Sequence, residues 1–139
     1  MSPHAKKAGQ GLDAALNSGK NLIVFPEGTS TDGQSVLPFK SSLFKLFIGD
    51  AREGLLIQPF SVKVLSSNRK TPETQEDRDL YAWHIDMDME LPQHLWRFAQ
   101  SRGAIIQLSF YRPVPAKDYN DRKTLAKLCH DTVSKGLEY

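Results

Sequence analysis

The segment Phe25-Pro26-Glu27-Gly28-Thr29-Ser30 carries residue types that can bind a phosphate or another polar group. It directly follows a short apolar run, and ligands of α/β proteins bind in the crevice beyond the carboxyl ends of such strands. Gly28 permits backbone geometry that other residues resist. The hydroxyl and N–H groups of Thr29, Ser30 and Thr31 are good partners for phosphate oxygens. The segment therefore predicts an anion-binding loop.

Two charged residues accompany this loop. Lys40 follows it shortly and could add a cation, whereas Glu27 cannot hold a phosphate by its charge. Glu27 is better suited to orienting a cation or to accepting hydrogen bonds from the loop. An ordinary tight turn with solvated serine and threonine side chains explains the segment equally well, because short glycine-containing loops are weak motifs.

A second candidate is the alternating set His84, Asp86, Asp88 and Glu90. On a strand these side chains would share one face, where an imidazole and three carboxylates could hold a divalent metal. We favour the alternative, a solvated strand face opposite an apolar one, because alternation is typical of a half-buried strand.

The other histidines predict no catalytic group. His94 lies in a predicted helix near Trp96 and Phe98 and is expected to pack there. His130 and Asp131 are adjacent, so on a helix we expect them to point in different directions and to form no dyad.

The elements that would position these residues alternate along the chain. The pattern predicts helices at residues 5–17, 39–50, 91–101 and 120–137, and strands at 22–25, 55–65, 80–89 and 104–111. Pro59 interrupts the second strand, and residues 27–34 and 66–79 read as loops. Such alternation implies a single α/β domain over residues 1–139 with parallel strand pairs.

Composition narrows the function classes. The chain has 139 residues, 40% apolar and 24% charged, and a net charge of +2, which is too small to indicate nucleic-acid binding. The single cysteine, Cys129, excludes a disulfide within the chain and favours a cytoplasmic setting, with Cys129 buried on the last helix. No apolar run reaches the roughly 18 residues that cross a bilayer, and we expect no transmembrane segment or signal peptide.

Residues 25–30 resemble the Phe-Pro-Glu-Gly-Thr-Arg signature of the lysophosphatidic acid acyltransferase family. The likeness extends to Asp32-Gly33, to Phe39-Lys40 with the helix that follows, and to the proline-centred strand Leu56-Ile57-Gln58-Pro59-Phe60. The later pattern from Tyr81 to His84 is similar to bacterial members. The resemblance implies a glycerol-phosphate acyltransferase-like α/β fold, with a mixed, largely parallel sheet flanked by helices and incomplete at its amino end.

The resemblance also implies a function: transfer of a fatty acyl group from acyl-CoA or acyl carrier protein to a lysolipid hydroxyl in phospholipid biosynthesis. It needs no metal or organic cofactor and places the protein peripherally at the cytoplasmic face of a membrane. Glu27, Gly28, Thr29, Ser30 and Lys40 would bind the acceptor. Pro59 and its neighbours would shape the acyl pocket.

Two departures from the family pattern matter. Ser30 replaces the usual arginine, a bidentate phosphate ligand, which leaves room for another head group such as that of a lyso-ornithine lipid. The family's catalytic His-x-x-x-x-Asp element is absent. The residues five positions after the four histidines are Gly9, Met89, Ala99 and Lys135.

In the family, the histidine of that element is the general base and the aspartate orients it. We therefore expect this chain to be the carboxy-terminal portion of an acyltransferase domain, with little or no turnover alone. The alternative is a non-catalytic remnant that binds lysolipid or another anionic ligand. A hydrolase is a weaker alternative, since no Gly-x-Ser-x-Gly elbow is present.

Overall fold

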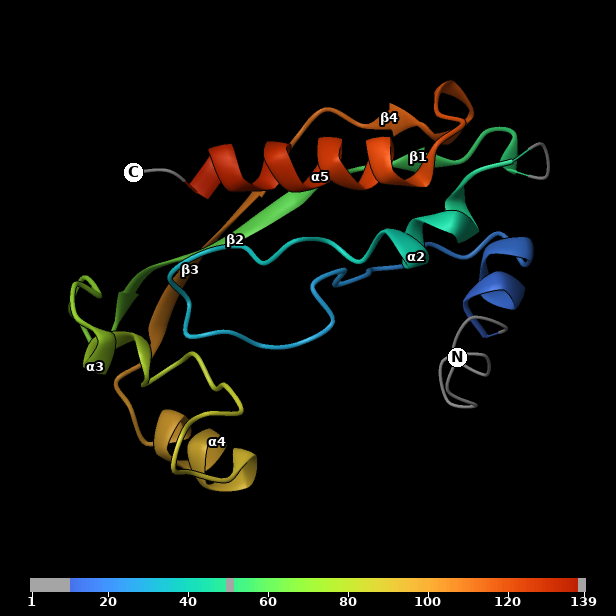
Figure 1. Cartoon of the computed structure of the whole chain (residues 1–139). Helices are drawn as coiled ribbons and strands as arrows, with labels where there is room; N and C mark the ends of the chain where they lie inside the picture. The colour runs from blue at the N-terminus through green and yellow to red at the C-terminus, as the bar shows by residue number, and fades with distance from the viewer. Residues whose placement is uncertain (1–10, 50–51, 138–139) are drawn as a thin grey trace.

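The computed structural model describes residues 11–49 and 52–137 (Figure 1). Residues 11–17 are helical. The elements that follow are α2 (Ser41–Phe44), η1 (Lys45–Phe47), β1 (Leu56–Ile57), β2 (Phe60–Ser67), α3 (Gln75–Arg78), α4 (Leu91–Ala99), β3 (Ala104–Phe110), β4 (Val114–Pro115), η3 (Ala116–Asp118) and α5 (Arg122–Leu137). In Figure 1, α2 and α5 lie near β1 and β4, whereas α3 and α4 lie at the far end of β2 and β3.

The strands form two small antiparallel sheets, β1 with β4 and β2 with β3. We call the β2–β3 pair the ribbon. Its register pairs Phe60 with Phe110 and Ser67 with Ala104, and a bulge between Val64 and Ser66 shifts it. The predicted parallel pairs are therefore wrong: both sheets among the described residues are antiparallel, and the helices pack beside them.

Residues 22–25 show why the parallel prediction failed. They are extended, but no described strand pairs with them. Leu22 and Val24 are half-buried, whereas Ile23 and Phe25 are 74% and 70% exposed. An apolar run becomes a strand only when a neighbouring strand forms hydrogen bonds with its backbone groups. Residues 22–25 have the sequence pattern of a strand but lack these hydrogen bonds to a neighbour among the described strands.

The predicted strand at residues 80–89 is also wrong, because this segment turns back on itself. The Met87 N–H donates to the His84 carbonyl at 3.1 Å, and Trp83 Nε1 donates to the Met89 carbonyl at 2.9 Å. These bonds close a series of turns. The alternation of apolar and polar residues at 80–89 therefore occurs in a loop. Residues 66–79, which we predicted to be a loop, include the short helix α3.

The remaining elements follow the sequence pattern closely. The strand predicted at residues 55–65 is interrupted at Pro59 and becomes β1 and β2. Helices α4 and α5 and strand β3 occupy the predicted ranges, and α4 has Pro92 in its first turn. The helix predicted at 39–50 is formed by α2 and η1, with Asp50 outside the described residues.

The core lies where α5 packs against α2 and η1. Its buried members are Phe44, Phe47, Leu125, Ala126 and Cys129. The rings of Phe44 and Phe47 meet edge to face with centroids 5.8 Å apart. No helix among the described residues is long and apolar enough to cross a membrane.

Cys129 is buried on α5 as predicted, and burial raises the pKa of its thiol to about 11. The thiolate is the reactive form. At pH 8 we therefore expect iodoacetamide to alkylate the folded chain roughly 100-fold more slowly than the urea-unfolded chain. Mass spectrometry of timed samples measures both rates, and equal rates would contradict the burial of this thiol.

The turn that follows β2 carries local strain. Asn68 and Arg69 both have positive φ, at 53° and 67°, and the Ser67 and Lys70 backbones exchange two hydrogen bonds around them. Tight hairpin turns of this type favour Asn-Gly, because glycine has no Cβ to clash. We expect Arg69→Gly to raise the free energy of unfolding by about 0.5–1 kcal/mol. Urea titration followed by circular dichroism measures the change, and a destabilised variant would contradict the assigned turn.

Three aspartates couple the fold to pH. Hydrogen bonds from Thr74 hold the pKa of Asp77 below its usual range, those from Thr124 do the same for Asp121, and the Lys127 ammonium, followed by His130, lowers the pKa of Asp131. A lowered folded-state pKa adds stability above the unfolded-state pKa, and this stability is lost as pH falls through the folded-state value.

We therefore expect the melting temperature to hold between about pH 5 and 7 and to fall below about pH 4. Asp121→Asn should flatten the acid limb, because asparagine still caps a helix but does not titrate there. A melting temperature that rises below pH 4 would contradict this assignment.

Candidate functional site

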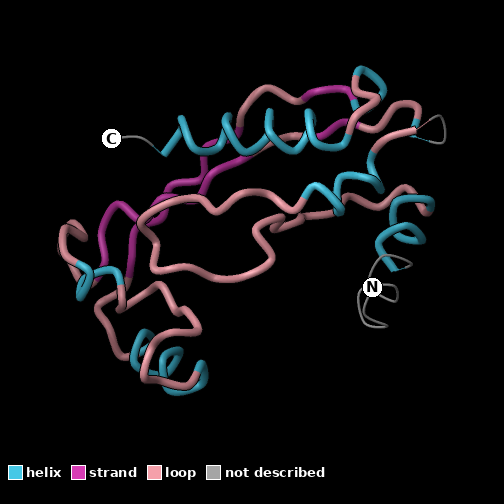
Figure 2. Tube along the Cα trace, viewed as in Figure 1, coloured by secondary structure: helices cyan, strands magenta, loops and turns pink. Residues whose placement is uncertain are grey.

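The candidate site is the loop at residues 27–40. Glu27 lies where the two ends of this loop come together, a place that we call the neck of the loop. The Glu27 carboxylate accepts a hydrogen bond from the Leu37 N–H at 2.8 Å. One residue before Glu27, the Pro26 carbonyl accepts from the Lys40 N–H at 2.9 Å. The hydrogen-bond role expected of Glu27 is thus present, and its carboxylate positions the loop. Figure 2 shows this loop as a long excursion that ends at the start of α2.

Gly28 and Lys40 are in contact across the neck. Gly28 has φ of +72°, and its N–H donates to the Phe25 carbonyl at 3.3 Å. A Cβ at position 28 would meet Lys40 Cε at 2.8 Å and Cδ at 3.0 Å. Only glycine combines this backbone conformation with this close approach, so the Lys40 stem lies directly over the Gly28 backbone.

Thr29 and Ser30 line the exposed side of the same loop. Thr29 Oγ1 donates a weak hydrogen bond to the Ser30 carbonyl at 3.4 Å. Thr29, Ser30 and Lys40 are all exposed, and Lys40 contacts the neighbouring Gly28. We call Thr29, Ser30 and Lys40 the polar rim. It offers hydroxyl donors and one ammonium group to a polar ligand.

The far end of the loop is fastened to α3. The side chain of Gln34 donates to Gln75 Oε1 at 2.8 Å, and Gln75 Nε2 donates to the Asp32 carbonyl at 3.4 Å. Asp32 also accepts from the Gln34 backbone at 3.1 Å. The loop is thus held at both ends, which limits the positions its rim can take.

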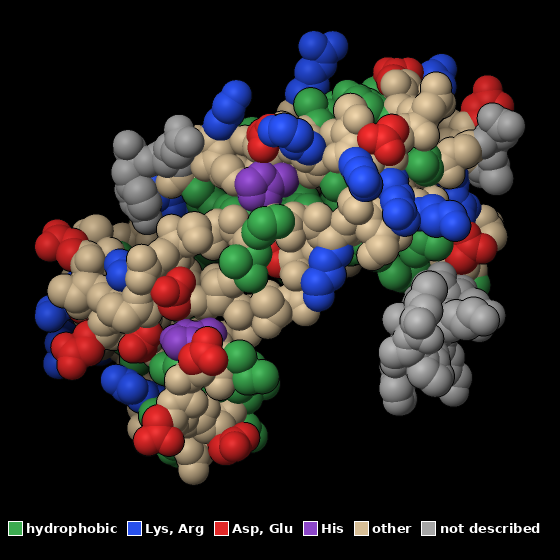
Figure 3. Space-filling view, in the orientation of Figure 1, with side chains coloured by type: hydrophobic (Ala, Val, Ile, Leu, Met, Phe, Trp, Pro, Cys, Tyr) green, Lys and Arg blue, Asp and Glu red, His purple; other side chains and the backbone are tan. Residues whose placement is uncertain are grey.

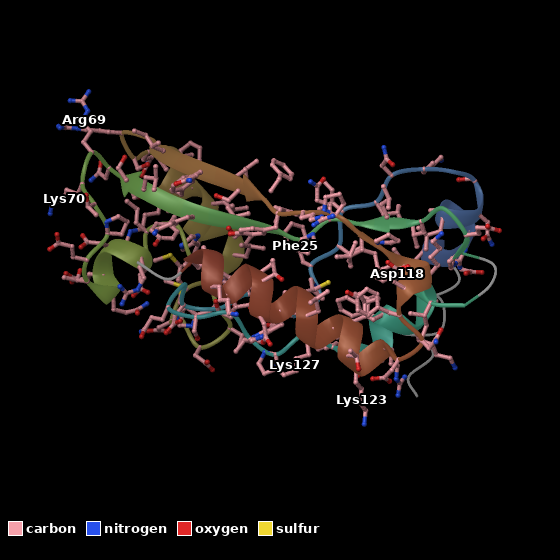
Figure 4. The ribbon with its side chains drawn as sticks, turned by 90° about the horizontal axis from the view of Figure 1, so that it is seen from above. Phe25, Arg69, Lys70, Asp118, Lys123 and Lys127 are labelled. Carbon is pink, nitrogen blue, oxygen red and sulfur yellow. The ribbon has the colours of Figure 1, made fainter. Side chains whose placement is uncertain are left out.

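An aromatic group lies on the other side of the neck. Phe25 meets Phe60 edge to face with ring centroids 6.4 Å apart, and Phe60 stacks on Phe110 at 5.7 Å. Pro59 is buried beside them, and its carbonyl accepts from the Tyr111 N–H at 3.0 Å. Figure 4 labels Phe25 near the junction of the ribbon and α5. The structure therefore connects the polar rim to an apolar surface through Phe25, a contact with no signal in the sequence spacing.

Two hollows of the described structure lie elsewhere. One, of about 380 Å³, lies between the β2 turn and α4, next to Ser67 and Arg97. The other, of about 320 Å³, lies between Phe39 and α5, next to Lys127 and His130. Neither is lined by residues 27–30, Lys40 or Pro59. Gly28, Thr29, Ser30 and Lys40 of the candidate site are themselves exposed.

The histidines correct one prediction. His130 Nδ1 lies 3.2 Å from Asp131 Oδ1, so these adjacent side chains do meet, because the carboxylate bends back along α5 toward both Lys127 and His130. His130 Nε2 faces the Val36 carbonyl at 3.4 Å. Both ring nitrogens face acceptor oxygens, so the pair anchors the loop to α5 instead of presenting a free base.

His94 is buried as predicted, and its Nε2 lies 2.9 Å from the Asp79 carbonyl. The strand on which the alternating set at residues 84–90 depends is not formed. Within residues 11–49 and 52–137, no three histidine, cysteine or acidic side chains are grouped so that they could hold a metal ion.

Residues 3–63, which include the loop and Pro59, match the model of the Acyltransferase family. The chain is similar to this family over somewhat less than half of its length. It is 36% identical over 138 residues to the lyso-ornithine lipid O-acyltransferase of Rhodobacter capsulatus, covering 97% of this chain and 47% of that protein.

Two further relatives agree with this placement. The lyso-ornithine lipid O-acyltransferase of Brucella abortus is 30% identical, over 88% of this chain and 46% of that protein. The 1-acyl-sn-glycerol-3-phosphate acyltransferase of Neisseria meningitidis is 28% identical, over 85% and 42%. The chain spans somewhat less than half the length of these relatives. No solved structure matches it at a significant level.

Proposed function

We propose that this chain is the acceptor-binding portion of a lysolipid acyltransferase, with residues 1–139 forming part of one catalytic domain. The observation that carries the proposal is the closed loop, in which Glu27 holds Leu37 and Lys40 lies over Gly28. The match of residues 3–63 to the Acyltransferase family and the names of the relatives support the reaction type. The reaction joins the acyl carbon of a thioester to the acceptor hydroxyl oxygen, breaks the C–S bond and leaves a free thiol.

The polar rim suits the acceptor head group. Lys40 supplies a positive charge, and the hydroxyls of Thr29 and Ser30 supply hydrogen bonds to a carboxylate or phosphate. Glu27 acts indirectly, because its carboxylate is used on the loop backbone. It is therefore a positioning residue. The general base that takes the hydroxyl proton lies outside this chain in the proposal.

The apolar side suits an acyl chain. Phe25 and Phe60, with Pro59 buried between the sheets, form a surface that begins where the polar rim ends. A lysolipid could place its head group at the rim and its tail along these rings. The acyl donor is an acyl thioester of coenzyme A or acyl carrier protein.

We also propose peripheral contact with the cytoplasmic face of a membrane. Figure 3 shows lysine and arginine side chains gathered over α5 and α2, and in Figure 4 Lys123 extends from α5 away from the sheet. Basic side chains near an anionic surface add modest attraction each.

Ser30 favours an acceptor without a phosphate monoester. A guanidinium at this position would bind phosphate in a bidentate manner, and a serine hydroxyl cannot. The relatives from Rhodobacter capsulatus and Brucella abortus are named for lyso-ornithine lipid. We therefore propose lyso-ornithine lipid, or a related lysolipid, as the acceptor.

The test uses a chimeric enzyme, in which this chain replaces the matched 47% of the Rhodobacter capsulatus relative. With acyl-CoA we expect thiol release that depends on added lyso-ornithine lipid and is slower by about 10-fold or more with lysophosphatidate. The intact relative serves as the positive control. A folded chimera that prefers lysophosphatidate would overturn the head-group assignment.

A second candidate is a binding module without catalysis. The absence of His-x-x-x-x-Asp from the sequence and the engaged ring of His130 favour it for the chain alone. Such a module would bind lyso-ornithine lipid micelles but release no thiol from acyl-CoA. Thiol release by the chain alone would exclude this candidate.

A further inference from the structure

The ribbon turns its apolar face to solvent. Residues directly opposite each other in an antiparallel pair share a face. Three such pairs are entirely apolar: Phe60 with Phe110, Val62 with Leu108, and Val64 with Ile106. Four of these six side chains are 46% to 63% exposed, namely Val62, Ile106, Leu108 and Phe110. This apolar face lacks a covering layer in the described structure.

The opposite face of the ribbon is polar and lies against α5. It carries the pairs Ser61 with Ser109 and Lys63 with Gln107. Ser61 is 2% exposed, and its hydroxyl lies 2.7 Å from the Tyr111 hydroxyl, which in turn abuts Gly136 of α5. Helix α5 thus covers the polar face near Ser61, although Gln107 farther along this face is exposed, whereas four of the six side chains on the apolar face are exposed.

The apolar face continues into the candidate site. Phe60 meets the ring of Phe25, which is itself 70% exposed, and Ile23 on the same extended segment is 74% exposed. The two sides of this segment differ, because Leu22 and Val24 are half-buried. The open surface therefore runs from the ribbon to the turn that leads into Glu27.

We infer that this apolar face is the interface for a further polypeptide layer, corresponding to the part of the acyltransferase relatives that lies outside their match to this chain. The relatives have sequence available for such a layer, because the match covers only 47% and 46% of the Rhodobacter capsulatus and Brucella abortus proteins. The face also has the composition that a protein core requires, six apolar side chains with no charge among them.

The position of the interface has a functional consequence, which rests on the proposed function. A layer seated on Phe110, Phe60 and Phe25 ends beside Gly28 and Lys40. Groups carried by that layer would thus approach the polar rim, where the acceptor hydroxyl must meet its base. The layer completes the site as well as the core.

Cysteine accessibility tests this interface. Leu108→Cys places a thiol on the apolar face, and Gln107→Cys places one on the neighbouring residue of the polar face. Native Cys129 is buried and contributes little background. Both variants are made in the isolated chain and in the chimera, with the cysteines of the Rhodobacter capsulatus portion replaced by serine. Maleimide labelling rates are then compared.

We expect the Leu108→Cys thiol to label at least about 10-fold more slowly in the chimera than in the isolated chain, because the layer excludes solvent. The Gln107→Cys thiol should label at similar rates in both. Equal Leu108→Cys rates in a folded chimera would overturn the inference. Two results with the isolated chain would also overturn it. One is slow labelling of Leu108→Cys in a chain that light scattering shows to be a dimer, and the other is slow labelling that begins only when phosphatidylglycerol vesicles are added.

The labelling readout separates this inference from the proposed function. A chimera that protects Leu108→Cys but transfers no acyl group would retain the interface and refute the function. A chimera that transfers acyl groups while Leu108→Cys stays fully reactive would retain the function and refute the interface.

Discussion

Replacement of Glu27 by alanine is expected to lower acyl transfer by the chimera about 100-fold, the scale of loss that follows a misplacement of about 1 Å in an active site. Glu27 accepts the Leu37 N–H and so fixes the neck of the loop that carries Gly28 and leads to Lys40. Without that acceptor, the Leu37 N–H is left unpaired and the rim is free to move. Thiol release and head-group dependence measure the effect.

A second variant, Glu27→Gln, separates the charge of Glu27 from its role as a hydrogen-bond acceptor. Its amide oxygen can still accept the Leu37 N–H, so we expect a loss of no more than about 10-fold. Glu53→Ala, an exposed carboxylate in the turn before β1, is the matched control and should leave the rate unchanged. If glutamine were as damaging as alanine, the charge of Glu27 would act directly, and its positioning role would be refuted.

Replacement of Leu125 by alanine should have the largest effect on stability, a loss of about 3 kcal/mol in the free energy of unfolding. Leu125 is 0% exposed and belongs to the cluster formed with Phe44 and Phe47. Its removal leaves a cavity between α5 and the α2–η1 segment, which the surrounding rings fill only in part. Urea unfolding followed by circular dichroism measures the loss.

Leu128→Ala provides the control on the same helix. Leu128 is 36% exposed and lies outside the cluster of buried residues, so its truncation should cost less than about 1 kcal/mol. Equal losses for the two variants would mean that the core does not lie between α5 and α2.

Local sequence signals predicted the elements that local chemistry determines. Pro59 lacks an N–H and interrupts a ladder, so the break between β1 and β2 could be placed from sequence. The helical periodicity of residues 120–137 likewise gave α5, and Cys129 was correctly placed in the core.

The errors concern contacts between distant residues. The apolar run at 22–25 cannot reveal whether a neighbouring strand exists, and antiparallel pairing of β2 with β3 depends on how residues 68–103 fold between them. At residues 80–89, the bond from Trp83 to the Met89 carbonyl overrides an alternating pattern. The meeting of His130 with Asp131 depends on side-chain torsions that helical spacing does not fix.

The candidate site also has some features that the sequence predicts and others that depend on the fold. Residue types alone indicated a polar loop at 27–30 and a hydrogen-bonding role for Glu27, and the bond to Leu37 agrees with that role. The partner itself is a backbone N–H ten residues away, which carries no sequence signal. The aromatic contact of Phe25 with Phe60 likewise joins segments that only the fold brings together. A substrate-binding role for Glu27, Gly28, Thr29, Ser30, Lys40 and Pro59 stays a prediction.

The central claim is that this chain supplies the acceptor-binding portion of a lysolipid acyltransferase. Its most direct test is mass spectrometry of lipid products after the chimera is incubated with palmitoyl-CoA and lyso-ornithine lipid. We predict a product heavier by one palmitoyl group, formed by the chimera and largely lost with Glu27→Ala. A folded chimera that forms no acylated product, under conditions where the intact Rhodobacter capsulatus relative does, would contradict the claim.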